Sequence, residues 1–208
     1  MKYESIRKEI VAYARKLYDD RLVSCTSGNI SVRIPESPNL MAITPGSEDY
    51  LTMTPDRIVI MTLDGTVVDG AARPSSEWRM HAGIYRERAD ISAVVHTHSA
   101  YATTFAVLHK PIPICLSEMI PWLGGEIAVA PFCVPGTSGL ADTALPLLTG
   151  RHACLLGNHG VLAVADALPL AYTRAAYVED AAKVSYLAMT VGKPVLLTDA
   201  EIRAVRGE

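Results

Sequence analysis

Basic clusters, long apolar runs and paired cysteines are all missing from this sequence of 208 residues. The formal net charge is -3 and the basic residues lie mostly singly, which argues against a nucleic-acid binder, because such proteins carry a basic patch or stripe. No segment approaches the ~20 apolar residues that a membrane-spanning helix needs. The first residues, MKYESIRKEI, lack the apolar core of a signal peptide, so the sequence predicts a cytoplasmic protein.

The cysteines Cys25, Cys115, Cys133 and Cys154 form no CxxC pair, and their spacing matches no zinc framework. Most of them stand in apolar surroundings, as in HACLL and PFCVP. The sequence therefore predicts buried free thiols in a reducing compartment.

Half of the residues are apolar and a fifth are charged, which is the composition of a chain with a substantial core. No repeat, low-complexity tract or linker divides it, so residues 1–208 are interpreted as one domain. Short strands interspersed with helices and hairpin turns favour an α/β layered fold with a mostly antiparallel sheet. Helices are predicted at 3–21, from a cap formed by Ser75 and Ser76, at 101–108, within 135–150, and from a cap at Asp166 to about 189. Strands are predicted after residue 29, at 40–44, at 57–62 with a hairpin turn at Asp64-Gly65, and at 91–98. Further short strands are predicted within 112–134 and on both sides of GNHG at 157–160.

The tripeptide His96-Thr97-His98 is the strongest chemical signal in the sequence. On a strand, residues i and i+2 point to the same face, so the two imidazoles lie together while Thr97 packs on the other side. His159 stands between glycines in GNHG, where the chain turns tightly. Three neutral imidazoles leave one position of a metal open, as in catalytic zinc sites.

Glu77 is a fourth candidate ligand or acid/base, because it follows PSS at the expected start of a helix, where a carboxylate is favoured. The alternative is an ordinary N-terminal glutamate. The other histidines, His81, His109 and His152, are interpreted as structural or exposed, with His81 packing beneath the site.

Three small-residue turns have the composition of an anion site. They are Ser27-Gly28-Asn29, Thr44-Pro45-Gly46-Ser47 and Ser75-Ser76 at a helix start. Hydroxyls, a side-chain amide and free backbone N–H groups bind phosphate in such turns. Caps and turns also use these residues for their own sake, so only convergence in the fold gives them meaning.

Taken in order, the motifs resemble the class II aldolase/adducin family over nearly the whole chain, closest to its L-fuculose-1-phosphate aldolase branch. The motifs are SGNIS (27–31), ITPG (43–46), YLTMTPDRIV (50–59), RPSSEW (73–78), AVVHTHS (93–99) and LLGNHGVLAVA (155–165).

The resemblance implies a three-layer α/β/α fold and a homotetramer with active sites at subunit interfaces, each subunit holding one Zn²⁺ or a similar ion such as Co²⁺ or Mn²⁺. By resemblance, the metal ligands are His96, His98 and His159, with Glu77 as the acid/base that also touches the metal. The implied phosphate site consists of Gly28, Asn29, Thr44, Gly46, Ser75 and Ser76.

The implied reaction is cleavage of a ketose 1-phosphate to dihydroxyacetone phosphate and an aldehyde through a metal-stabilised enediolate. The substrate would be L-fuculose 1-phosphate or a 5-deoxy or 5-methylthio pentulose 1-phosphate. Alternatives on the same scaffold are methylthioribulose-1-phosphate dehydratase, 3-oxo-tetronate-4-phosphate decarboxylase and a sugar-phosphate 4-epimerase. The short interval between His98 and His159, and Glu77 where the epimerases have Asp, favour the aldolase. A non-catalytic adducin-type interaction domain is disfavoured by the complete histidine triad.

Three features depart from the family pattern. TPGS stands in place of TPSG, and the chain ends at Glu208 without an aromatic tail. Ser117 occupies the place where the aldolase has a catalytic tyrosine. Glu118 follows it, and the resemblance to the dehydratase branch makes Glu118 a candidate acid/base; the alternative is a surface or interface carboxylate.

Overall fold

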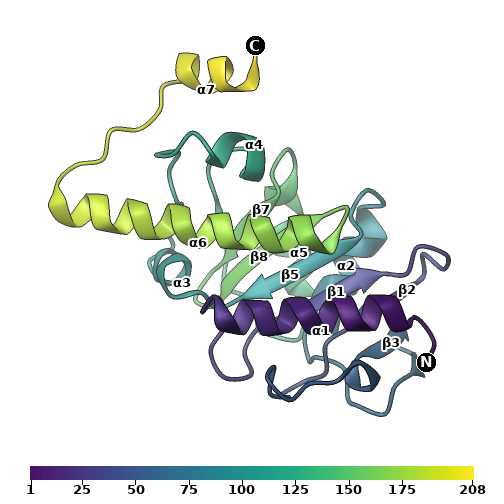
Figure 1. Ribbon diagram of the computed structural model, residues 1–208. Helices are drawn as coiled ribbons and strands as arrows, with labels where there is room; N and C mark the ends of the chain where they lie inside the picture. Colours follow the sequence, from purple (N-terminus) through teal and green to yellow (C-terminus); the bar gives the residue numbers. More distant parts are fainter.

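An eight-stranded sheet in the order β4-β3-β2-β1-β5-β8-β7-β6 forms the centre of the computed structural model, which describes residues 1–208 (Figure 1). Every neighbouring pair is antiparallel except β6 and β7, which run parallel. The strands are β1 (Asn29–Arg33), β2 (Leu40–Ile43), β3 (Val59–Thr62), β4 (Val67–Asp69), β5 (Ala93–Thr97), β6 (Val129–Ala130), β7 (Ala153–Leu156) and β8 (Gly160–Ala165).

Helices cover both faces of this sheet. One face packs against α1 (Glu4–Asp19), α3 (Ala100–Val107), α4 (Met119–Leu123) and α6 (Leu168–Val191). The other packs against α2 (Trp78–Glu87), α5 (Gly139–Ala144) and the short 3-10 helix η2 (Leu145–Leu148). The two apolar clusters lie on opposite sides of the strands, so the predicted three-layer α/β/α fold is confirmed.

The apolar pattern of the sequence explains this layering. In α1, Ile10, Ala14 and Leu17 recur at helical spacing and are fully buried against the sheet. Strand β5 is buried along its whole length because both of its faces are covered. Its alternation sends Val95 toward the α1/α6 layer and Val94 toward α2. His96 therefore faces the α2 layer.

Two predicted helix starts were wrong. Glu77 itself is the N-cap of α2, and the serines before it are not helical. An isolated bridge between Pro45 and Pro74 and the bond from the Ser75 N–H to the Thr44 carbonyl keep this segment extended. Similarly, α6 begins after Ala167 without a side-chain cap, so Asp166 does not cap it.

Other differences are local. Arg57 lies in the 3-10 helix η1 (Pro55–Arg57), so the predicted strand 57–62 begins only at Val59. The segment 112–134 contains α4 in addition to the short strand β6. A final helix, α7 (Asp199–Arg206), lies beyond the end of α6 and beside α4, where the Arg206 guanidinium donates to the Gly124 carbonyl (Figure 1).

The cysteines are all free, but the prediction that they are buried holds fully only for Cys154. Cys25 is exposed, and Cys115 and Cys133 are partly buried. Cys25 lies in the turn after α1, with a positive φ of 54°, so the apolar strand environment that buries Cys154 is absent there. None of the helices is both long enough and apolar enough to cross a membrane.

Candidate metal centre and active site

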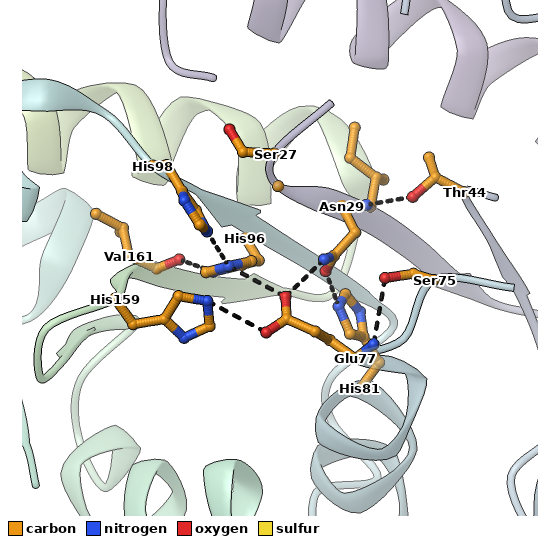
Figure 2. Close-up of polar contacts among 12 residues, drawn as sticks. Ser27, Asn29, Thr44, Ser75, Glu77, His81, His96, His98, His159 and Val161 are labelled. Carbon is orange, nitrogen blue, oxygen red and sulfur yellow. Dashed lines mark hydrogen bonds and ion pairs between the residues drawn. The ribbon is translucent and has the colours of Figure 1, made fainter. Parts of the chain in front are cut away.

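Three histidines meet where β5 ends beside the β7–β8 hairpin (Figure 2). His96 lies on β5 opposite Leu162 of β8, and His98 follows just after the strand. The hairpin turn carries His159 and ends at Gly160. The HxH spacing and the GNHG turn thus bring the three rings together, as the sequence indicates.

The three rings are close enough to share one ion. One nitrogen from each lies within 4.8 Å of the others, and the Nε2 atoms of His96 and His98 are 2.9 Å apart. Glu77 reaches the same point from the start of α2: Oε2 lies 3.2 Å from Nε2 of His96, and Oε1 lies 3.2 Å from Nε2 of His159. Figure 2 shows the carboxylate directed between these rings.

The hydrogen bonding and the burial of the rings suit a cation ligand set. Nδ1 of His96 donates to the Val161 carbonyl at 2.7 Å, so the lone pair of the neutral ring lies on Nε2, toward the cluster. Burial, and then the neighbouring His98, hold the pKa of His96 well below its usual value. Burial likewise lowers the pKa of His98. Neutral imidazoles and one carboxylate fit a divalent ion such as zinc.

The Glu77 carboxylate is supported from below by Asn29 and His81. Asn29 Nδ2 donates to Glu77 Oε2 at 2.8 Å, and its Oδ1 is bonded to Nε2 of His81. His81 is fully buried, as the interpretation that it packs beneath the site implies. The Asn29 side chain, which the sequence suggested for the phosphate, is therefore already engaged at both ends.

A polar cleft of about 620 Å³ opens above the histidines. Of the six residues predicted for the phosphate, five line it, namely Gly28, Asn29, Gly46, Ser75 and Ser76. Thr44 does not line it: the buried Thr44 hydroxyl accepts a bond from the Ile30 N–H at 3.1 Å. Five of the six predicted positions thus converge on one cleft.

Sequence reasoning missed two contributors to this cleft. The exposed Arg73 is the only arginine or lysine in the lining. It stands directly before the PSSE motif, and this position was the sequence signal that could have identified it. Tyr50 is buried and donates to the carbonyls of Ser27 and Gly28 at 2.8 and 2.7 Å, so it fixes the first turn. A lone tyrosine in a loop gave no indication of this bond.

Some candidates lie elsewhere. Glu118 is exposed, accepts from the Ser117 hydroxyl at 3.0 Å and does not line the cleft of its own chain. His109 is exposed and bonded to Asn158 Oδ1 at 2.6 Å. His152 directly precedes β7 and lines a separate pocket with Arg174, and partial burial lowers its pKa. The prediction that His109 and His152 are structural or exposed agrees with these positions.

The model of the class II aldolase and adducin N-terminal domain matches residues 8–186. The chain belongs to the class II aldolase and adducin family. The prediction made from the six motifs is confirmed.

Members of this family that resemble the chain include enzymes with defined activities. A 5-deoxy-D-ribulose 1-phosphate aldolase of Bacillus thuringiensis serovar kurstaki is 41% identical over 196 residues, covering 94% of this chain and 91% of the relative. A 5-methylthioribulose-1-phosphate/5-deoxyribulose-1-phosphate aldolase of Rhodospirillum rubrum is 34% identical, covering 97% and 89%. A solved structure named L-fuculose 1-phosphate aldolase superimposes with a TM-score of 0.93 at 40% identity, covering 100% of this chain and 97% of the other. The expected class, a class II aldolase, is confirmed by these relatives.

Proposed function

We propose that this class II aldolase cleaves a 5-deoxy or 5-methylthio pentulose 1-phosphate, or L-fuculose 1-phosphate, to dihydroxyacetone phosphate and an aldehyde. The observation that carries the proposal is the Glu77 carboxylate, 3.2 Å from two histidines of the triad and at the floor of a polar cleft. Relatives named for these substrates support the choice.

The histidine triad and Glu77 have separate roles in the proposed reaction. His96, His98 and His159 would hold the ion, with Glu77 beside it. A bound Zn²⁺, Co²⁺ or Mn²⁺ supplies Lewis-acid stabilisation of the negative charge that develops on the ketose oxygens when the carbon–carbon bond breaks. Glu77 takes and returns the proton at its carboxylate, a role that requires an ionised group within hydrogen-bond reach of the substrate.

The cleft wall orients the phosphate end of the substrate. Gly28 has a φ of 79°, and a Cβ there would lie 2.7 Å from the His96 carbonyl oxygen, so only glycine lets this turn approach β5. The hydroxyls of Ser75 and Ser76 and the guanidinium of Arg73 complete a lining suited to an anion. Fixing the phosphate here holds the reacting carbons beside Glu77.

The assembly is part of the proposal. In a homotetramer with active sites at subunit interfaces, the exposed Glu118 would serve a neighbouring cleft as the acid/base that replaces the family tyrosine. Its exposure and its absence from the lining of its own cleft support this placement.

The test is release of dihydroxyacetone phosphate, measured by a coupled assay on a panel of ketose 1-phosphates with added zinc, cobalt or manganese. We expect release that a chelator abolishes, and that Glu77→Gln lowers by about 100- to 10,000-fold because the proton acceptor is lost. The exposed Glu36→Gln is the matched control and retains activity. Full activity of Glu77→Gln, or no release from any substrate by the metal-loaded wild type, would contradict the proposal.

A second candidate is dehydration of methylthioribulose 1-phosphate, because Ser117 and Glu118 stand where the aldolase branch has tyrosine. Product analysis separates the two, since only the aldolase releases dihydroxyacetone phosphate.

A further inference from the structure

Five buried side chains form a continuous row of hydrogen bonds beneath the cleft. Asn29 links Glu77 to His81, and Nδ1 of His81 lies 2.6 Å from the Ser31 hydroxyl. The Tyr85 hydroxyl lies 2.8 Å from the Ser31 hydroxyl and 2.9 Å from the Ser31 carbonyl oxygen, so its single proton is shared between these two acceptors. His81 and Ser31 are completely buried, so no water competes for these bonds.

The Glu77 carboxylate determines which group donates and which accepts in each hydrogen bond from Glu77 to Ser31. An ionised carboxylate only accepts, so Asn29 must present its NH₂ group to Glu77 and its oxygen to His81. Nε2 of His81 must then carry the proton, and the bare Nδ1 must accept from the Ser31 hydroxyl. Complete burial lowers the pKa of His81 to about 3, which keeps the ring neutral with a single N–H. The opposite amide orientation would place two acceptors 2.8 Å apart.

We propose that His81 is a positioning residue: its Nε2–H fixes the amide of Asn29, so that Nδ2 holds the Glu77 carboxylate against His96 and His159. The inference rests on the proposed function for its catalytic consequence, but the tautomer of His81 is independent of it. The ring nitrogens of His81 bond Asn29 and Ser31, and the residue does not line the cleft, so Asn29 is its hydrogen-bonded link to Glu77.

Substitutions at His81 separate positioning from packing. His81→Leu removes the donor, and we expect kcat to fall about 10- to 100-fold, the usual effect of losing a supporting partner, with KM changed little. His81→Gln restores an N–H at the position of Nε2, and most of kcat returns. Ile84→Ala, on the same helix and equally buried in the apolar core, is the control: it lowers the Tm without lowering kcat.

The tautomer is read directly by ¹⁵N NMR of histidine-labelled, zinc-loaded protein, with the His81 ring assigned from its loss in His81→Gln. We expect a neutral ring protonated at Nε2 at neutral pH. A proton on Nδ1, wild-type kcat in His81→Leu, or no recovery in His81→Gln would overturn the inference. Wild-type protein that releases no dihydroxyacetone phosphate would instead refute the proposed function, and the NMR result would still decide the orientation of the row.

Discussion

At the scale of single residues, some polar side chains around the cleft support the backbone and others hold the Glu77 carboxylate. Thr44 supports the backbone of β1 through the Ile30 N–H, and Tyr50 fixes the turn at Gly28. Asn29 and His81 instead hold a carboxylate. Each of these groups is buried and bonded, because an unsatisfied buried polar group costs about 1–3 kcal/mol.

His81 also makes stability depend on pH. Its pKa is lowered to about 3 in the folded chain from 6.5, because burial disfavours the charged ring. Between these values the unfolded chain binds a proton that the folded chain does not, so stability rises with pH through this window and falls on acidification. We expect the free energy of unfolding to drop by on the order of a few kcal/mol from pH 6.5 toward pH 3.

The measurement is urea unfolding of chelator-treated protein across this pH range, alongside His81→Gln. The variant lacks the titrating ring, so its stability should change less with pH, while the contributions of the other histidines cancel in the difference. Parallel curves for the two proteins would contradict the assignment.

Two local patterns selected the histidine triad from the sequence. Alternation along one strand places His96 and His98 on the same face, and the glycine-flanked turn singles out His159. The same local reasoning could not show that the Asn29 side chain bonds a carboxylate, because its partners, Glu77 and His81, lie at the start of α2 and within it. Partners distant in sequence leave no local pattern, which also explains the missed role of Tyr50.

At the scale of elements, the β7–β8 hairpin sets the spacing of the site. A Cβ on Gly160 would overlap the Thr97 carbonyl oxygen and lie 3.1 Å from Cδ2 of His98 and 3.2 Å from Cε1 of His96. We expect Gly160→Ala to force β5 and β8 apart, lowering stability by about 1–3 kcal/mol and weakening metal binding.

Gly192→Ala is the matched control, because nothing lies within 4 Å of its Cβ position and its backbone is extended. Thermal unfolding and metal content after dialysis compare the two variants. Equal metal retention by Gly160→Ala and wild type would show that the hairpin has room to move.

Long periodic elements such as α1 and β5 were predictable because one apolar pattern runs through each of them. The start of α2 was not, since the bridge at Pro45–Pro74 overrides the capping preference of the serines. By contrast, α7 was overlooked although Thr198 and Glu201 form a capping box, a signal visible in the sequence.

At the scale of the whole molecule, the C-terminal half of α6 leaves an apolar face uncovered. Val184, Leu187 and Val191 recur at spacings of three and four residues, and their exposed fractions are 36%, 45% and 91%. We expect this face to lie in a subunit contact of the proposed homotetramer, because burying an exposed apolar face is favourable.

We expect light scattering of the purified protein to give the mass of four chains, and Leu187→Glu to shift the distribution to smaller species. A charge introduced at an apolar interface is desolvated without a partner. Val68→Glu makes the same change at an exposed site on β4, the edge of the sheet, and should leave the mass unchanged. A monomeric wild type would contradict the tetramer.

The strand order also determines when the site can exist. Asn29 on β1 pairs with His96 on β5, and His96 pairs with Leu162 on β8, so the three central strands come from distant parts of the chain. Such non-local pairs require large loops to close, which slows folding. During synthesis the ligand set is incomplete until the β7–β8 hairpin has emerged from the ribosome. The nascent chain first presents only His96 and His98 of the triad, so we expect an ion to find its complete ligand set at the candidate site only after the sheet has closed.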